Sequence, residues 1–189
     1  YRGDGKGGWT KDTSAGGPGD PSRTHVSVGV TALDANGDGH ADVLVVNLHD
    51  ANDLYLGDGK GGWTKDTSTG GPGDPSHFED SRGVTPLDAN GDGLKDVLVV
   101  NFNQANDLYL GDGKGHWTKD TSTGGPGDPS HVQNSYGVTA LDANGDGHAD
   151  VLVVNDGHAN DLYLGSVTGG WTNDSSSGGP GDPSRTRLS

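Results

Sequence analysis

Residues 34–47 read DANGDGHADVLVVN, an acidic, glycine-containing loop that leads directly into a short apolar run. The phrase recurs with few changes at 88–101 and 142–155, each copy 54 residues after the one before. Such constant spacing indicates a tandem-repeat architecture, in which each unit buries its apolar surface against its neighbours. The 189 residues hold three and a half of these units.

Each unit contains four short strand candidates and no helical periodicity. In the first full unit they are GVTALD, DVLVVN, DLYLGD and WTKDTS, at 29–34, 42–47, 53–58 and 63–68. Apolar and β-branched runs between Gly, Asn and Asp turns favour strands. Because DVLVV is apolar on both faces, its sheet needs cover on both sides, which a stack of sheets provides. We therefore expect an all-β chain of β-propeller-type blades, each made of four antiparallel strands.

The repeat also predicts the internal boundaries of the chain. A half blade with the third and fourth strands plus a linker occupies 1–22, full blades occupy 23–76 and 77–130, and a last blade with its C-terminal linker occupies 131–189. A Trp recurs once per unit, at positions 9, 63, 117 and 171. We interpret it as inter-blade packing; the alternative is an aromatic platform for a sugar.

The Asp-rich loops have the spacing of a calcium site. Oxygen-bearing side chains stand at loop positions 1, 3, 5 and 9, Gly stands at position 6, and position 7 would offer its backbone carbonyl. Position 12, where an EF-hand has Glu, is Val here, so the ninth-position Asp would close the site. The alternative is a metal-free hairpin of Asx turns. The predicted ligands are Asp34, Asn36, Asp38, His40 and Asp42; Asp88, Asn90, Asp92, Leu94 and Asp96; and Asp142, Asn144, Asp146, His148 and Asp150.

These motifs resemble a known repeat family. The loop DANGDGHAD, the strand DVLVVN and the later NDLYLGDGKGGW are similar to the FG-GAP and VCBS repeats of the integrin α-subunit superfamily. The resemblance implies a β-propeller, typically of seven blades, with metal sites inside the blades, in extracellular adhesion proteins, lectins and secreted proteins. Seven units of this length would need twice the present chain. Two copies would not supply matching half blades, so we expect an incomplete or open array.

The composition narrows the possible functions. The formal charge is −15, from 27 acidic residues against 12 Lys and Arg, and cysteine is absent. A field of this sign attracts cations and disfavours nucleic acid and anionic membranes, and the longest apolar runs are far too short to insert in a bilayer. No His lies in a pattern with a Ser or Cys nucleophile, so we expect no enzyme activity.

Two clusters of residues differ between units, one before the first strand and one after the second. A four-stranded meander places both at the end of the blade opposite the Asp-rich loops, where a rigid scaffold carries binding loops. The candidate ligand-binding residues are His25, His49, Phe78, Arg82, Phe102, Gln104, Tyr136 and His158. Neutral drift at tolerant loops is the alternative. Asn173 heads a sequon and is a candidate glycosylation site.

The sequence thus predicts an extracellular or cell-surface repeat module, stabilised by Ca²⁺ at three sites, that recognises a carbohydrate or an extracellular protein. The alternative is a structural repeat protein whose copies associate in a fibre, sheath or stalk. The tripeptide Arg2-Gly3-Asp4 is one that cell-surface receptors read. However, the other units have Leu-Gly-Asp or Leu-Gly-Ser there, so we assign it to the common turn.

Overall fold

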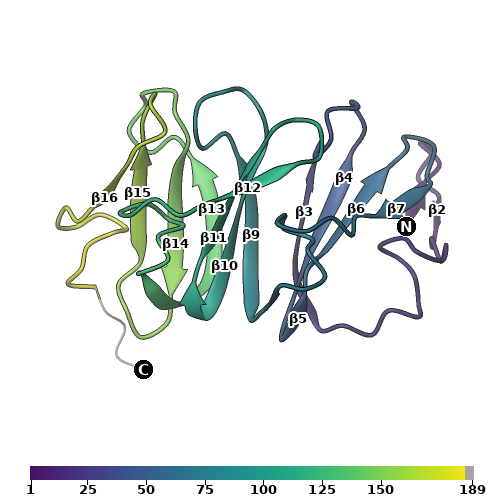
Figure 1. The fold of residues 1–189 in the computed structure, drawn as a ribbon, viewed down its shortest axis with the longest axis horizontal. Helices are drawn as coiled ribbons and strands as arrows, with labels where there is room; N and C mark the ends of the chain where they lie inside the picture. The colour runs from purple at the N-terminus through teal and green to yellow at the C-terminus, as the bar shows by residue number, and fades with distance from the viewer. Residues whose placement is uncertain (186–189) are drawn as a thin grey trace.

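The computed structural model describes residues 1–185 and is built from β-strands (Figure 1). Each full unit folds into a four-stranded antiparallel meander, which confirms the predicted all-β blades. Blade 1 contains β3 (Ser27–Leu33), β4 (Asp42–Asn47), β6 (Asp53–Gly57) and β7 (Trp63–Lys65). Blade 2 contains β9 (Ser81–Leu87), β10 (Asp96–Ala105), β11 (Asp107–Gly111) and β12 (Trp117–Asp120). Blade 3 contains β13 (Val132–Leu141), β14 (Asp150–Asn155), β15 (Asp161–Gly165) and β16 (Trp171–Asp174).

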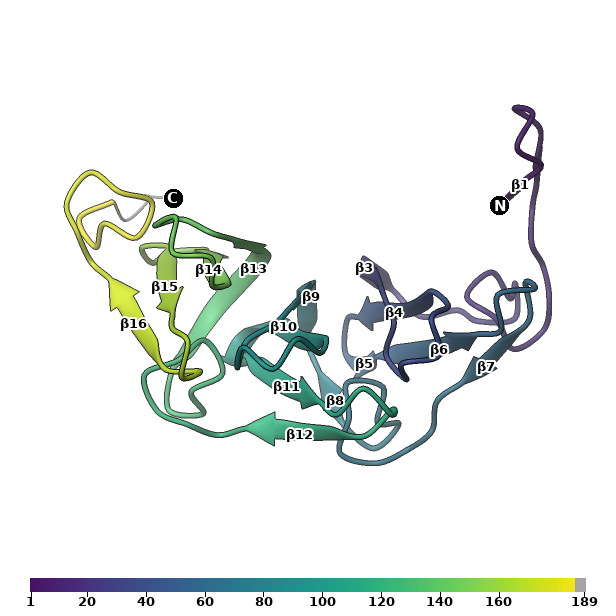
Figure 2. The same ribbon diagram turned by 90° about the horizontal axis from the view of Figure 1, so that it is seen from above.

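The three blades follow one another around an open arc. Figure 2 shows the first strands β3, β9 and β13 on the concave side and the fourth strands β7, β12 and β16 on the convex side. Short ladders join neighbouring blades: β5 (Asp50–Ala51) pairs with β8 (Phe78–Glu79), and the extended end of β10 pairs with the start of β13. The array is therefore curled and propeller-like. In residues 1–185 there is no helix long and apolar enough to cross a membrane.

The apolar core lies between blades. One buried cluster combines Leu44 and Val46 of blade 1 with Val97 and Val99 of blade 2, all 0% exposed. A second cluster joins blade 2 to blade 3 in the same way. Trp117 packs against the first cluster and Trp171 against the second, which confirms inter-blade packing at these two positions, whereas Trp9 of the N-terminal hairpin is 72% exposed. Both faces of the DVLVV strand are thereby covered in blade 2, which has a neighbour on each side.

The first strands approach each other closely at a repeated glycine. A Cβ added to Gly83 of β9 would lie 3.1 Å from Val100 Cγ2 and 3.4 Å from the Cα of Gly137, on the next first strand. A side chain here would hold neighbouring blades apart, which explains why the GVT phrase begins with glycine.

The GGPGDPS connectors fold around an aspartate. The Asp74 carboxylate accepts hydrogen bonds from the N–H of Gly70 (2.7 Å) and from the N–H and hydroxyl of Ser76 (2.8 and 2.6 Å). Asp20, Asp128 and Asp182 make the same contacts in the other connectors. The connectors are thus ordered turns that set the spacing between blades.

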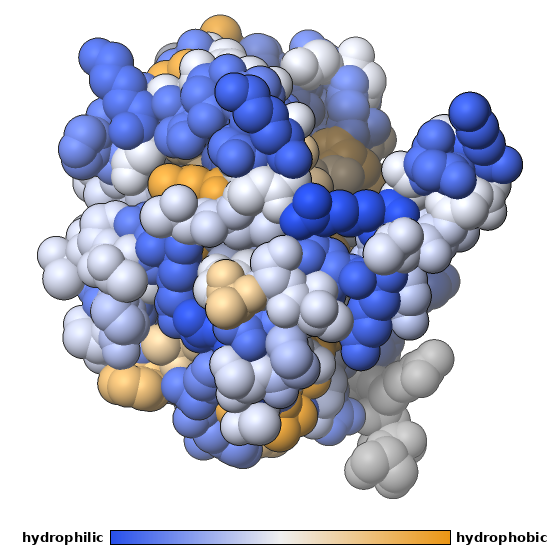
Figure 3. Space-filling view, turned by 90° about the vertical axis from the view of Figure 1, so that its right-hand side faces the viewer, coloured by the Kyte–Doolittle hydropathy of each residue, from blue (hydrophilic) through white to orange (hydrophobic). Residues whose placement is uncertain are grey.

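The first residues form a small separate hairpin of β1 (Arg2–Gly3) and β2 (Trp9–Thr10). Arg2 pairs with Asp12 (2.8 Å) and donates to the carbonyl of Gly61 in blade 1, and both strands are exposed. Figure 3 views the molecule from this side, which is largely hydrophilic with small separate hydrophobic patches.

Candidate functional site

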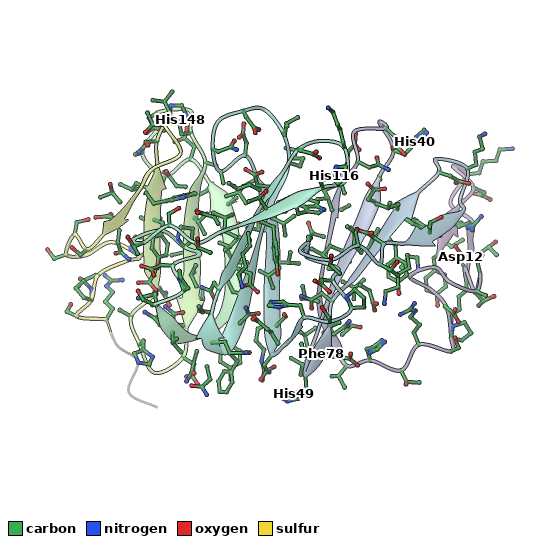
Figure 4. The ribbon with its side chains drawn as sticks, in the orientation of Figure 1. Asp12, His40, His49, Phe78, His116 and His148 are labelled. Atoms are coloured by element: carbon green, nitrogen blue, oxygen red, sulfur yellow. The ribbon has the colours of Figure 1, made fainter. Side chains whose placement is uncertain are left out.

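The two predicted kinds of site lie at opposite ends of the blades. Figure 4 shows His40 and His148, from the first and third Asp-rich loops, at one end, and His49 and Phe78, from the variable segments, at the other. This placement follows from the meander, because the β3–β4 type of turn and the β4–β6 type of connection leave the second strand in opposite directions.

Within each Asp-rich loop, side-chain oxygens face the loop's own backbone. Asp34 accepts hydrogen bonds from the N–H groups of Gly37 (2.8 Å) and Gly39 (2.9 Å), and Asp38 accepts one from His40 (2.8 Å). The Asn36 oxygen accepts one from Asp38 at 3.0 Å. The loops at 88–96 and 142–150 repeat these contacts. Positions 1, 3 and 5 of each loop are thus gathered on one side of a tight turn.

The ninth-position aspartates are buried braces. Asp42 is 0% exposed; its Oδ2 accepts the N–H of Ala35 and its Oδ1 that of Gly57, both at 2.8 Å. Asp96 and Asp150 make the same pair of contacts. Each brace ties the start of its loop to the end of the blade's third strand. This partner was not predicted from the sequence, although the recurring Gly of LYLG, at 57, 111 and 165, marks its position.

Several carboxylates lie close together at the end of each blade that carries the Asp-rich loop. Burial raises the pKa of Asp42, and the neighbouring charges of Asp38 and Asp34 raise it further, against the lowering effect of its two hydrogen bonds. Burial is again the main cause of the raised pKa of Asp96. The donor set, three carboxylates, one amide and one backbone carbonyl, consists only of oxygen and suits a hard divalent cation. The residues present therefore fit Ca²⁺.

At the variable end, an arginine lies against two aromatic rings from different blades. The Arg82 guanidinium carbon is 5.0 Å from the ring centre of Phe102 and 5.3 Å from that of Tyr136. The two rings pack edge to face at 5.6 Å. Arg82 also pairs with Asp80 at 2.8 Å. β9, β10 and β13 each contribute one member, so this cluster exists only where blades 2 and 3 meet.

The other five candidate ligand residues differ in how close they lie to this cluster. Gln104 accepts the N–H of Asp80 (3.0 Å), and His158 lines a pocket with Tyr136. His49 is 78% exposed, 3.9 Å from Asp80, and has a positive φ of 55°. His25 pairs with Asp50 (2.6 Å) in blade 1, and Phe78 projects from β8, 62% exposed. The structure thus brings together Arg82, Phe102, Gln104 and Tyr136, which we call the aromatic–arginine cluster.

The sequon residue Asn173 lies on the exposed strand β16. Its amide nitrogen, the atom that a glycan would modify, donates a hydrogen bond to Asp161 at 3.2 Å.

The fold and the repeated loops define the class of protein: an open array of propeller-type blades with Asp-rich turns. Comparison with protein families matches the FG-GAP-like repeat at residues 34–99 and 88–153, which together span more than half of the chain. The chain therefore belongs to the FG-GAP-like repeat family. Repeats of this family are typical of extracellular adhesion and recognition modules and are generally non-enzymatic. A comparison with curated proteins finds no significant match.

Proposed function

We propose that the chain is a calcium-stabilised extracellular module that recognises a carbohydrate or protein partner through its variable end. The observation that carries the proposal is that two kinds of residue lie at opposite ends of each blade. Uniform acidic loops lie at one end, and residues that differ from blade to blade meet at the other.

Ca²⁺ would be held by loop positions 1, 3, 5 and 9 and by the position 7 carbonyl. Its role is mechanical, because a bound cation offsets the repulsion of three carboxylates and fastens the turn to the first two strands of the blade. The chain has no disulfide to supply this rigidity. A rigid blade holds the variable end in a fixed geometry, which lowers the entropic cost of binding.

The aromatic–arginine cluster supplies the chemistry of recognition. Aromatic residues and Arg are the types that most often anchor protein interfaces, and aromatic rings also stack on sugars. Tyr136 is 43% exposed and faces the pocket that it shares with Asp156 and His158, whose polar groups suit hydroxyl or amide partners.

The proposal is tested with the full chain in Ca²⁺ and in EDTA. Ca²⁺ is expected to raise the melting temperature, and labelled protein is expected to bind a subset of a glycan array or of immobilised matrix proteins. Tyr136→Ala should abolish this binding. Tyr1→Ala is the matched control. It alters an 81% exposed tyrosine beside the N-terminal hairpin and should leave the binding unchanged. An unchanged melting temperature in EDTA refutes the calcium role, and equal effects of both tyrosine variants refute the binding surface.

A second candidate, a self-associating structural array, is favoured by the outer faces of blades 1 and 3. Val154 is 43% exposed, whereas its equivalents Val46 and Val100 are fully buried under the next blade. Val30 is 67% exposed, whereas its equivalent Val84 packs on blade 1. A second copy would cover each face in a head-to-tail arrangement.

Sedimentation velocity tests this candidate. Val30→Asp and Val154→Asp should each be monomeric alone, and their mixture should form dimers, because each variant keeps the face that the other has lost. A wild-type chain that remains monomeric at high concentration excludes self-association.

A further inference from the structure

Blade 2 contains a partly buried cluster that the Asp-rich loops and the aromatic–arginine cluster do not include. Its members are His77, which precedes β8, Glu79 in β8, and Asp107 at the start of β11. The His77 Nε2 atom lies 3.0 Å from Glu79 Oε1 and 3.2 Å from Asp107 Oδ2. The three side chains are 35%, 14% and 3% exposed. Glu79 is the only glutamate in a chain whose other acidic residues are all aspartate.

The internal repeat shows that this arrangement is peculiar to blade 2. At the equivalent positions blade 1 has Arg23, His25 and Asp53, where Arg23 pairs with Asp53 at 3.1 Å. Blade 3 has His131, Gln133 and Asp161. An imidazole that faces this Asp thus occurs in blades 2 and 3, but only blade 2 adds a second carboxylate.

The second carboxylate places two acids around one imidazole nitrogen. One Nε2–H proton is shared between two carboxylate oxygens. Lys119 pairs with Asp107 through its other oxygen, Oδ1, and the Asn101 amide donates to both acids. Two carboxylates in a largely buried site therefore meet one ammonium group and one imidazolium, because the hydrogen bonds to Asp107 and Glu79 raise the pKa of His77 to about 10. Buried charges of like sign are unfavourable unless a cation lies between them.

The donor separations suit a small metal ion. Zn²⁺ binds imidazole nitrogen and carboxylate oxygen at about 2.0–2.2 Å in tetrahedral geometry, which places neighbouring donors about 3.3–3.5 Å apart. The observed 3.0 and 3.2 Å need only a small expansion. A metal would displace the Nε2 proton of His77 to solvent, accept one lone pair from each of the three atoms, and leave a fourth position for water. The Lys119 charge would remain on the far oxygen of Asp107.

We propose that His77, Glu79 and Asp107 form a binding site for a divalent transition-metal ion such as Zn²⁺, separate from the Asp-rich loops. The ion would fasten β8 to β11 within blade 2. Because β8 also pairs with β5 of blade 1, with Asp50 opposite Glu79, the ion would stiffen the joint between these blades at the variable end. The inference does not depend on the proposed recognition function.

Cobalt serves as the spectroscopic probe. The full chain, stripped of metal and then saturated with Ca²⁺, is titrated with Co²⁺ while visible ligand-field absorption is followed, and Zn²⁺ is then added in competition. The expected result is one equivalent of Co²⁺ with a dissociation constant of about 1 μM or below, displaced by Zn²⁺.

Two variants, both taken from the chain's own repeat, locate the site. Glu79→Gln gives blade 2 the His–Gln–Asp set that folds in blade 3, and should weaken Co²⁺ binding by more than about 100-fold. Gln133→Glu builds the blade 2 set into blade 3, and should raise the stoichiometry to two equivalents. The absence of saturable binding, binding that Glu79→Gln leaves unchanged, or a stoichiometry that Gln133→Glu does not raise would each overturn the assignment.

Discussion

Replacement of Asp96 by Asn tests the buried brace of blade 2. The Asp96 carboxylate is 0% exposed and accepts hydrogen bonds from Ala89 N (2.8 Å) and Gly111 N (2.9 Å). Asn keeps one acceptor and turns an NH₂ group towards the other N–H donor. Loss of a hydrogen bond to a charged group costs about 1.5–3 kcal/mol, and the orphaned donor adds about 1–3 kcal/mol. Part of this loss in stability is offset, because a neutral Asn side chain is easier to bury and is not repelled by the charges of Asp88 and Asp92.

The net expectation is a loss of about 2 kcal/mol in the free energy of unfolding, or about 4–8 °C in melting temperature for a chain of this size. The assay is thermal unfolding in EDTA, followed by circular dichroism and tryptophan fluorescence, so that hydrogen bonding is measured without metal. Asp92→Asn is the matched control, because Asp92 lies in the same loop but is exposed. If both variants melt at the same temperature in EDTA, Asp96 is not a structural brace.

Three further outcomes are expected from the fold. Leu98→Ala opens a cavity in the fully buried cluster between blades 2 and 3 and should cost about 3 kcal/mol in urea unfolding; a loss below about 1 kcal/mol contradicts the inter-blade core. Gly83→Ala places a methyl group 3.1 Å from Val100 Cγ2 and should cost about 1–3 kcal/mol, and unchanged stability would show that the first strands tolerate separation. Hydrogen bonds from the Gly16 N–H, the largest cause, and from Ser22 hold the pKa of Asp20 at about 2. Because this folded-state pKa lies below the unfolded value, the Asp20 contribution is present above about pH 4 and is lost as pH falls towards 2. Asp20→Asn should therefore be less stable than wild type at pH 7, with the difference vanishing near pH 2; a constant difference refutes the linkage.

Residues close together in sequence determined much of the fold. The turn residues of DANGDG and the β-branched run DVLVVN define a strand, a tight loop and a second strand by local preference alone. The constant spacing of these phrases predicts equivalent blades, and the apolar faces of DVLVV predict stacking. The blades, and the inter-blade packing of Trp117 and Trp171, are accordingly found where the sequence indicated.

The chemistry of the individual contacts was decided by tertiary structure. Asp42 meets Gly57 only because the third strand aligns beside the second, and Arg82 reaches Phe102 and Tyr136 only because two blades stack in one register. Glu79 looked like one variable residue among several until the fold placed it against His77 and Asp107. A repeat specifies its common contacts in every unit. Positions that vary carry no periodic signal, so their partners depend on strand register and blade packing, which link residues far apart in the chain.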